Sequence, residues 1–332
     1  MKSPILLWIY NKLTNHLKCY AICLFLSCVS TLCAQTVMTN DLIWHGENYA
    51  SFTSLVFYKG YFYCSFRNAN KHADSSGNDC GIIKIIRSKQ GDVWEDYLSF
   101  SEKGYDLRDP QMSITPDNVI MLLTNKVQYK DGKVVYRQTC YSFIDDDHSS
   151  SPLSPIEFDP VLVNNWLWNV EWIKNKAYGF IYIPYFALVE SQDGVHYHII
   201  NKINLDDTPS EASLIKKWRK RVAVVRRNTT TMIGVYKNKK WEWFDSELKI
   251  ACPKLFKIRG KIYLLGRYYG ETKQTALFLL DENKHTLDYL IGIPGKTDCA
   301  YPGIVYKDKM LYVSYYSGDG KNSDIYFAKI KL

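Results

Sequence analysis

A strand–turn–strand pattern that recurs along the chain limits the folds that this sequence can adopt. In its clearest copy, two apolar runs flank Lys59-Gly60, as in a β-hairpin with a tight turn. Five copies lie at residues 55–66, 114–122, 172–180, 255–265 and 304–314. No segment has a sustained helical period, apart from a short ambiguous stretch at 211–218. The chain is therefore expected to be all-β rather than a helical bundle.

The spacing of these hairpins predicts the architecture. They return about every 40 to 60 residues, which is the spacing of propeller blades built from four strands each. We predict a single six-bladed β-propeller of four-stranded antiparallel blades over residues 35–332, with residues 37–50 closing the ring against the last blade. The blades are expected to begin near residues 51, 108, 166, 210, 252 and 301. The 26 Tyr, 9 Trp and 14 Phe agree with this fold, because aromatic residues favour strands.

A second, shorter repeat falls in turns between the expected strands. Ser191-Gln-Asp-Gly-Val-His-Tyr197 has the form Ser-x-Asp-Gly followed by an aromatic residue, and segments 87–94 and 236–241 look like degraded copies. Asp and Gly fold such a turn, because Asp bonds the nearby backbone and Gly tolerates a left-handed conformation. The aromatic residue is expected to pack between neighbouring blades.

The first 34 residues have the form of a secretory signal peptide. Lys12 and Lys18 precede an apolar run at 20–32, and the small residue Ala34 stands before Gln35. The run is shorter than the roughly 20 residues that a membrane-spanning helix needs. We expect an exported protein, periplasmic or secreted, that is mature from about Gln35 and has no stable membrane span. A surface lipoprotein is the less favoured alternative.

Charge and motif content limit the classes of partner and cofactor. The formal net charge is +8, of which three lysines before residue 35 contribute three. Basic residues are scattered along the sequence rather than in blocks, so an anionic small substrate is a better expectation than nucleic acid. The histidines form no HExxH pattern, and no phosphate-binding or dinucleotide-binding loop is present. We expect no metal, no cofactor and, by default, a monomer.

Five cysteines remain beyond residue 35, at positions 64, 80, 140, 252 and 299. An odd number without CxxC spacing excludes a zinc framework and leaves at most two disulfides. Cys64 and Cys80 would pair if their strands were neighbours. Small buried cysteines in strands are the favoured interpretation.

Several polar motifs follow one another in the second half of the chain. Pro209-Ser-Glu-Ala-Ser-Leu-Ile is followed by Val224-Val-Arg-Arg-Asn228, then by Leu265-Gly-Arg-Tyr-Tyr269 and by Asp298-Cys-Ala-Tyr-Pro-Gly303. With the Ser-x-Asp-Gly turn, which has the Asp-box form, these motifs resemble the sialidase (neuraminidase) superfamily over essentially all of residues 35–332. The resemblance implies an exo-α-sialidase-like six-bladed propeller. It also implies four site residues in the family's order, namely Glu211, Arg226, Arg267 and Tyr301.

The chemistry of a keto-acid sugar explains the implied roles. Such a sugar carries a carboxylate on its anomeric carbon, and Arg226 and Arg267 would bind it through paired, charge-assisted hydrogen bonds. The same charge would repel a carboxylate nucleophile, whereas the neutral phenol of Tyr301 avoids the repulsion. An unperturbed Tyr has a pKa of about 10 and needs a base, which is the role implied for Glu211. The expected reaction is hydrolysis with net retention through a glycosyl-tyrosine intermediate.

The first blade departs from the family pattern. The family usually opens it with Arg-Ile-Pro, whose arginine belongs to a carboxylate-binding triad, but Ser51-Phe52-Thr53 stands here instead. Arg67 matches an accessory arginine that the family carries one strand later. Arg108 opens the second blade within an Arg-x-Pro motif and is another possible replacement, unless it forms a salt bridge with Asp106 or Asp109. Both arginines are expected near the pocket.

The general acid has several candidates. The family places an Asp in the loop after the accessory arginine, and that loop corresponds here to residues 68–79. Asp74 is the first choice by its distance from Arg67. His72 is the second, because a histidine with a pKa near 6.5 can protonate a leaving oxygen at neutral pH. Asp79 lies further along the loop.

Together these features predict an exported retaining exo-glycosidase of sialidase type. Its expected substrate is terminal, α-ketosidically linked sialic acid or a related 2-keto-3-deoxy sugar acid on a glycan or glycoconjugate. Trp166 and Trp168 would either stack on the sugar or pack between blades. The alternative is a carbohydrate-binding propeller without catalysis, or a diverged enzyme that acts on another acidic glycan as a uronic-acid hydrolase or lyase. The Glu211–Tyr301 pair argues against loss of catalysis, whereas the missing Arg-Ile-Pro argues for divergence.

Overall fold

The computed structural model describes residues 35–332 apart from 47, 75, 78–79 and 146. The predicted signal peptide lies outside the described residues. Residues Gln35–Lys331 form one compact unit whose regular structure consists of β-strands. Within the described residues, no helix has the length and apolar character that a membrane crossing needs. The all-β prediction is therefore confirmed for this part of the chain.

The strands form five sheets, of which three contain four antiparallel strands in sequence order. One sheet consists of β6 (Asp106–Ile114), β7 (Ile120–Lys130), β8 (Lys133–Ile144) and β9 (Ser154–Pro155). The next consists of β15 (Ala212–Lys217), β16 (Lys220–Arg226), β17 (Thr231–Lys237) and β18 (Lys240–Ser246). The third consists of β19 (Ile250–Ile258), β20 (Lys261–Tyr269), β21 (Lys273–Asp281) and β22 (Thr286–Ile293).

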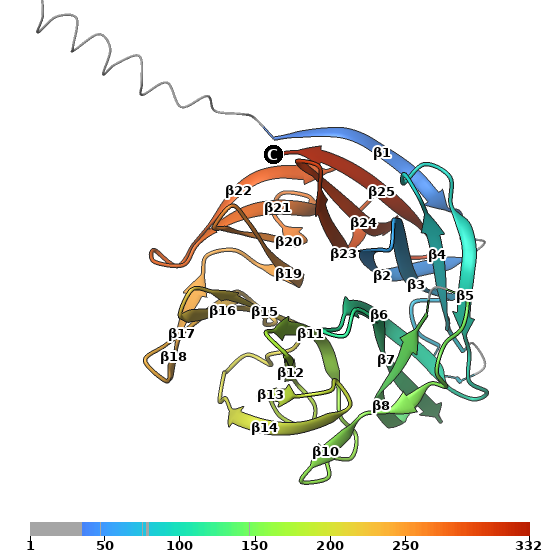
Figure 1. Ribbon diagram of the computed structural model, residues 1–332, viewed down its shortest axis with the longest axis horizontal. Helices are drawn as coiled ribbons and strands as arrows, with labels where there is room; N and C mark the ends of the chain where they lie inside the picture. Colours follow the sequence, from blue (N-terminus) through green and yellow to red (C-terminus); the bar gives the residue numbers. More distant parts are fainter. Residues whose placement is uncertain (1–34, 47, 75, 78–79, 146) are drawn as a thin grey trace, which may run out of the picture. The chain divides into compact units, whose positions relative to one another are not determined.

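The fourth sheet adds a fifth strand to the same plan. Its antiparallel strands are β11 (Leu167–Ile173), β12 (Lys176–Ile181), β13 (Ala187–Ser191) and β14 (His196–Lys202). The short strand β10 (Glu157–Asp159) joins the outer edge in parallel with β14. In Figure 1, the first strands β6, β11, β15 and β19 of these four sheets face the middle of the unit.

The eight-stranded sheet combines two four-stranded groups. One group is β2 (Tyr49–Tyr58), β3 (Tyr61–Ala69), β4 (Ile82–Ser88) and β5 (Glu95–Phe100). The other is β23 (Asp298–Lys307), β24 (Met310–Gly318), β25 (Ser323–Lys331) and, paired antiparallel to β25, β1 (Thr36–Trp44). A single parallel residue pair, Tyr49 with Ser323, joins the groups. The sheet count is therefore five rather than the six separate blades predicted, because β2 begins beside the first residue of β25.

A register break near the start of the first strand recurs in five of these groups. The breaks lie between residues 51 and 54, 108 and 111, 167 and 170, 251 and 254, and 300 and 303. Four residues in these breaks adopt the left-handed conformation, namely Phe52 (φ 60°), Asp109 (φ 51°), Cys252 (φ 53°) and Tyr301 (φ 51°). Such bulges bend a strand and re-aim one side chain. Here Phe52, Trp168, Cys252 and Tyr301 converge in one core cluster.

The Ser-x-Asp-Gly turn has the predicted geometry. Asp193 Oδ1 accepts hydrogen bonds from the backbone amides of Val195 and His196, both at 2.9 Å, and Gly194 has a φ of 81°. The aromatic residue of the repeat, Tyr197, is buried. The turn therefore rests on Asp and Gly for the reasons inferred from the sequence.

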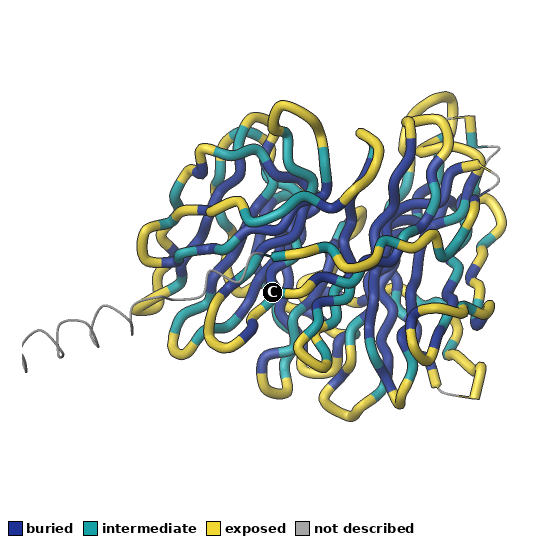
Figure 2. The backbone as a smooth tube through the Cα atoms, turned by 90° about the horizontal axis from the view of Figure 1, so that it is seen from above, coloured by how far each residue is buried: buried dark blue, intermediate teal, exposed yellow. Residues whose placement is uncertain are grey.

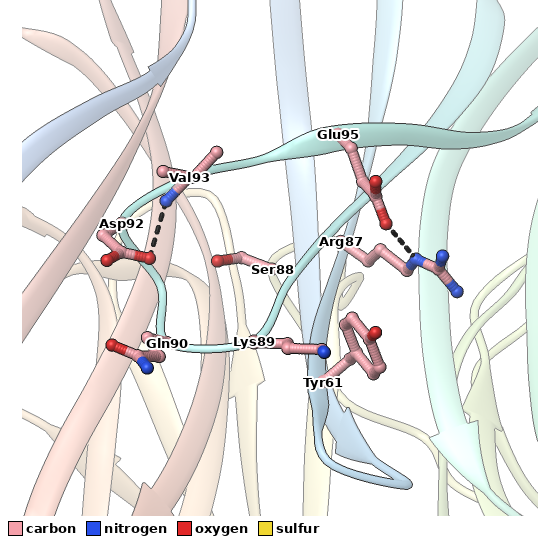
Figure 3. A pocket seen from close by; sticks show the side chains of 8 residues that line it. All are labelled: Tyr61, Arg87, Ser88, Lys89, Gln90, Asp92, Val93 and Glu95. Atoms are coloured by element: carbon pink, nitrogen blue, oxygen red, sulfur yellow. Dashed lines mark hydrogen bonds and ion pairs between the residues drawn. The ribbon is translucent and has the colours of Figure 1, made fainter.

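The degraded copy at 87–94 keeps part of this design. The backbone amide of Gly91 donates to Ser88 Oγ at 2.9 Å. Trp94 packs against Phe327 of β25, with ring centroids 5.2 Å apart. A hollow of about 420 Å³ lies at this turn (Figure 3). Arg87 and Glu95 pair across it at 2.6 Å.

The interior is built from the strands, with the loops exposed (Figure 2). None of the five described cysteines forms a disulfide, and four of them are buried. The possible Cys64–Cys80 disulfide is therefore wrong. Cys64 is sealed inside β3, whereas Cys80 lies in the partly exposed loop before β4.

Candidate functional site

The candidate site is centred on a tyrosine and a carboxylate from different sheets. The Tyr301 hydroxyl donates a 2.5 Å hydrogen bond to Glu211 Oε1. Arg226 Nη1 lies 2.9 Å from the same oxygen, and the backbone amide of Cys252 donates to Oε2 at 2.8 Å. Tyr301 and Glu211 are both buried. The structure thus brings together three residues that the sequence assigns to the site.

The two partners differ in how their surroundings affect ionisation. Burial alone would raise the pKa of Glu211, but Arg226, the Tyr301 hydroxyl and the Cys252 amide outweigh it and hold the pKa below its ordinary value. Burial raises the pKa of Tyr301, and the negative charges of Asp109 and Glu211 raise it further. At neutral pH the site therefore holds a carboxylate beside a neutral phenol.

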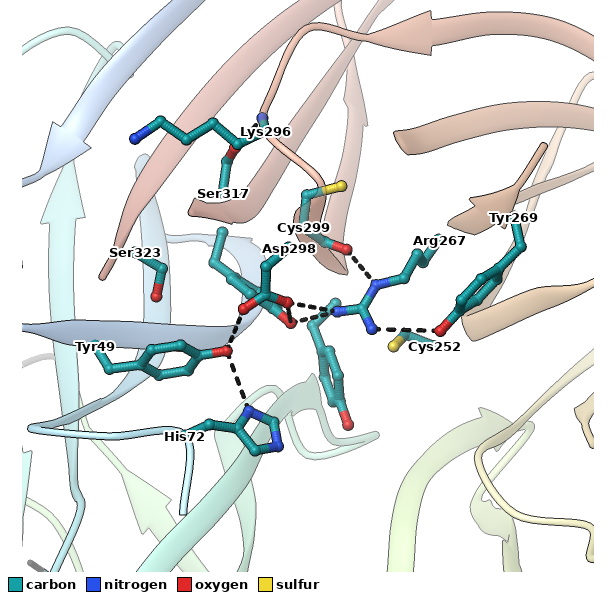
Figure 4. Close-up of polar contacts among 12 residues, drawn as sticks. Tyr49, His72, Cys252, Arg267, Tyr269, Lys296, Asp298, Cys299, Ser317 and Ser323 are labelled. Carbon is teal, nitrogen blue, oxygen red and sulfur yellow. Dashed lines mark hydrogen bonds and ion pairs between the residues drawn. The ribbon is translucent and has the colours of Figure 1, made fainter. Parts of the chain in front are cut away.

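Arg267 is fixed by acceptors on the neighbouring strands (Figure 4). Its Nε donates to the Cys299 carbonyl at 2.6 Å, and its Nη2 lies 3.2 Å from Asp298 Oδ1 and also bonds the Tyr316 hydroxyl. Asp298 in turn accepts a 2.5 Å hydrogen bond from the Tyr49 hydroxyl. This network orients the guanidinium in the absence of a ligand.

His72 extends the same network from the loop after β3 (Figure 4). Its Nδ1 lies 3.1 Å from the Tyr49 hydroxyl, whose proton goes to Asp298. We therefore assign the hydrogen of the neutral ring to Nδ1, which leaves Nε2 as an acceptor. The ring packs edge-on against Phe52 and Tyr49, although the residue keeps an exposed face. Removal from water and the positive charge of Arg108 lower the pKa of His72.

Arg67 and Arg108 share one buried carboxylate. Arg67 Nε lies 2.8 Å from Asp106 Oδ1, and Arg108 Nη1 lies 3.0 Å from Oδ2. The salt bridge of Arg108 with Asp106 that the sequence left open is therefore present. Both arginines also donate to backbone carbonyls of residues 71–72, so Arg67 ties that loop to β3 and Arg108 ties it to β6. Their side chains are 0% and 10% exposed, whereas that of Arg226 is 37% exposed and is the more open to a ligand.

Aromatic side chains fill the place of the missing first-blade arginine. The Phe52 ring lies 4.6 Å from that of Tyr301 between centroids, and the Arg108 guanidinium lies 5.1 Å from the Phe52 centroid. Trp168 packs edge-on against Tyr301 and is almost fully buried. Of its two expected roles, Trp168 thus takes the packing one. Trp166 is only partly buried.

Asp109 is the acidic residue to which sequence reasoning gave no role in the site. It is buried, and its carboxyl makes no hydrogen bond or ion pair with any residue that the structure describes. Burial raises the pKa of Asp109 to about 7, with Arg108 opposing the shift and Glu211 adding to it. A sequence signal for it exists, since Asp109, Cys252 and Tyr301 each stand directly before a proline.

The loop acids make different contacts. Asp74 Oδ1 accepts hydrogen bonds from Ser76 N at 3.1 Å and from Ser76 Oγ at 2.7 Å, in a turn. Asp79 lies outside the described residues. His72 contacts the cluster around Tyr49 and Phe52. Across the described part of the chain, no group of three or more His, Cys, Asp or Glu side chains is placed to hold a metal ion.

Comparison with known proteins identifies the fold class. No protein-family model matches the chain, and no curated protein matches its sequence. The structure of a protein of unknown function from Dyadobacter fermentans is similar over 91% of this chain and 100% of its own, with a TM-score of 0.77 and 17% identity. The phage phi92 endosialidase is similar over 89% of this chain and 69% of its own, with a TM-score of 0.66 and 8% identity.

A third similar structure is the NanB sialidase from Streptococcus pneumoniae, over 88% of this chain and 70% of its own, with a TM-score of 0.64 and 10% identity. At these identities the likeness concerns the fold. The chain has an all-β, sialidase-like propeller fold.

Proposed function

We propose that this protein is a retaining glycosidase of sialidase type, acting on terminal, α-ketosidically linked sialic acid or a related 2-keto-3-deoxy sugar acid. The observation that carries the proposal is the 2.5 Å hydrogen bond from Tyr301 to Glu211. Arg226 beside this pair and Arg267 nearby supply the positive charge that an anionic sugar requires. A protein that only binds sugar has no need of a base on a buried phenol.

The proposed reaction assigns each of these groups a role. Arg226, the more open arginine, binds the substrate carboxylate together with Arg267. Tyr301 Oη forms a bond to the anomeric carbon while its proton passes to Glu211, and the bond to the leaving oxygen breaks. Water then attacks the anomeric carbon from the face that the leaving group vacated, and its proton passes to the carboxylate that protonated the leaving oxygen. This second displacement breaks the bond to Tyr301 Oη and gives net retention of configuration. Glu211 returns the proton to the departing phenolate.

For protonation of the leaving oxygen, we favour Asp109 over Asp74 and His72. An acid with a pKa of about 7 still carries its proton near neutral pH, when a donor is needed. The neutral ring of His72 offers an acceptor at Nε2, and the nearby arginines oppose its protonation. Asp74 bonds Ser76 within its own turn.

The proposal includes two finer features of the molecule. Counted as two blades, the eight-stranded sheet gives six blades in all, and β1 would close the ring. The signal-peptide form of residues 1–34 supports export, which would bring the enzyme to glycans outside the cytoplasm.

The test compares residues 35–332 with the Tyr301→Phe variant on fluorogenic α-ketosides of several keto-deoxy sugar acids. We expect sugar release by the native protein and a loss on the order of 10³-fold in kcat for the variant, since the nucleophile is removed. Tyr306→Phe is the matched control, because Tyr306 lies on the same strand but is exposed. Native protein that is folded but releases no sugar from any ketoside would instead favour a binding propeller or action on another acidic glycan.

A further inference from the structure

Positive charge is concentrated in one short stretch of the chain. Residues 216–261 contain fifteen Lys and Arg and only three Asp and Glu, a net charge of +12. Residues 35–332 as a whole carry +5, because the three lysines before residue 35 account for the rest of the +8. The remainder of residues 35–332 therefore carries −7, so the charge is strongly asymmetric.

The fold gathers many of these cations at the ends of three hairpins. The turns between β15 and β16, β17 and β18, and β19 and β20 lie at the same end of two successive sheets (Figure 1). Lys257 Nζ donates to the Lys216 carbonyl at 3.4 Å and so links the first turn to the third. We call this surface the basic edge; it comprises Lys216, Lys217, Arg219, Lys220, Lys237, Lys239, Lys240, Lys257, Arg259 and Lys261.

Few acidic groups neutralise the basic edge. Lys217 pairs with Glu282 at 2.7 Å, and Lys220 bonds the Asn283 side chain at 2.9 Å. Six exposed cations form no ion pair with any described residue, namely Arg219, Lys237, Lys239, Lys240, Arg259 and Lys261. So many unpaired like charges on adjacent turns repel one another, and an external polyanion would relieve the repulsion.

An exposed tryptophan stands at the tip of the basic edge. Trp218 is 84% exposed and has a φ of 56° in the turn between Lys217 and Arg219. A hollow of about 590 Å³ beside it is lined largely by the hairpins β15–β16 and β17–β18. Tryptophan is favoured at membrane–water interfaces, where its ring is apolar and its indole N–H stays wet. Lys and Arg around it would contact anionic headgroups.

The basic edge and the candidate site lie at opposite ends of the same strand. Glu211 directly precedes β15, and Trp218 directly follows it. Six residues of strand span about 20 Å. A surface bound at Trp218 would therefore leave Glu211 on the far side.

We propose that the basic edge docks this protein onto an anionic lipid surface, with Trp218 in the headgroup layer and the candidate site facing away from it. A lipid surface fits better than a polysaccharide chain, because Trp218 projects from a turn and the cations spread over three turn tips. Anionic headgroups attract each nearby Lys or Arg, within a Debye length of about 10 Å at 0.1 M salt.

The test measures partitioning of residues 35–332 onto vesicles. This segment is suitable because Gln35–Lys331 is a compact unit that contains every described strand. We expect binding to phosphatidylcholine vesicles that contain phosphatidylglycerol, and little binding to pure phosphatidylcholine. Each cation near an anionic surface should contribute roughly fivefold to the partition coefficient. Arg219→Gln with Lys239→Gln should therefore lower this coefficient at least about tenfold. Trp218→Ala should lower it by roughly tenfold and, unlike the charge variant, should act equally at high salt.

The control changes two cations at the site end. Lys130→Gln with Lys133→Gln removes the same charge beside the turn between β7 and β8, and should leave vesicle binding nearly unchanged. Equal losses in both double variants would overturn the proposal, because net charge rather than the basic edge would then govern binding. Equal partitioning onto both vesicle types, or retention on a sulfated polysaccharide without vesicle binding, would also overturn it.

Discussion

Phe52 shows how one residue redirects the chemistry of the site. It belongs to Ser51-Phe52-Thr53, the segment that stands where the family pattern has Arg-Ile-Pro, and it shares the left-handed bulge geometry of Tyr301. Its ring cannot bind a carboxylate, and it covers one side of Arg108 instead. Under the proposed function, the carboxylate of the substrate would therefore be bound by arginines from other strands, chiefly Arg226.

Asp109 provides a prediction about stability as well as chemistry. Its pKa is about 7 in the folded protein and 3.8 in an ordinary carboxyl, so the unfolded chain ionises first as pH rises. Between these values, native stability falls with increasing pH, by at most about 4 kcal/mol in all. Asp109→Asn removes this dependence. We therefore compare the unfolding free energies of the variant and the native protein in urea titrations between about pH 4 and 8. Their difference should grow in favour of the variant as the pH rises, and should level off above about pH 7.

The control for this prediction is Asp117→Asn, which changes an exposed carboxylate in the turn after β6. Its unfolding free energy should run parallel to that of the native protein at every pH. Parallel curves for Asp109→Asn as well would mean that Asp109 is ionised in the folded state, and the proposed proton donor would then be lost.

At the level of elements, a Ser-x-Asp-Gly turn with complete hydrogen bonding should stabilise the protein more than a degraded copy does. Asp193 bonds two backbone amides and the Ser191 hydroxyl, whereas Asp92 in the degraded copy bonds, among the described residues, only the amide of its neighbour Val93. Asp193→Ala should therefore destabilise the protein by roughly 1–2 kcal/mol in urea unfolding. Asp92→Ala should stay within about 0.5 kcal/mol of the native value. Equal losses of stability in the two variants would show that the additional hydrogen bonds of Asp193 do not account for its contribution.

The strands were predictable because each is short, apolar and bounded by a turn residue of known chemistry. Lys59-Gly60 and the Ser191–Gly194 turn fall where the sequence indicates. The sheet count was not predictable, since it depends on one contact between Tyr49 and Ser323, which are far apart in sequence. Similarly, the resemblance located Glu211 and Tyr301 but assigned no role to Asp109. Its position before a proline, which it shares with Tyr301, gains meaning only with its burial and the unbonded Oδ1.

The distribution of charge is a property of the whole molecule that the linear sequence shows only in part. The expectation of scattered basic residues is wrong for residues 216–261, where fifteen Lys and Arg face only three Asp and Glu. The fold adds to this concentration, because three hairpins of the segment end on the same side. The consequence is a molecule with two distinct ends, one holding the tyrosine–glutamate pair and the other the basic edge.

Closure of the unit depends on β1, the first described strand, which pairs with β25, the last one. Seven residue pairs join them, and Trp44 of β1 packs on Phe66 with centroids 5.4 Å apart. Without β1, the edge of β25 would be open to pairing with other molecules. Removal of residues 35–45 should therefore lower the thermal midpoint by more than about 5 °C and promote aggregation, both measurable by calorimetry and light scattering.

The matched control keeps the β1 backbone and removes only its outward side chains. Met38→Ala with Leu42→Ala should leave the thermal midpoint almost unchanged, because both side chains are more than half exposed. An unchanged midpoint in the truncated protein would mean that the single pair between β2 and β25, together with the core around Phe52 and Tyr316, suffices to hold the two groups. A fall in the truncated protein alone would assign closure to the β1–β25 ladder together with the packing of Trp44 on Phe66, since the double variant keeps both.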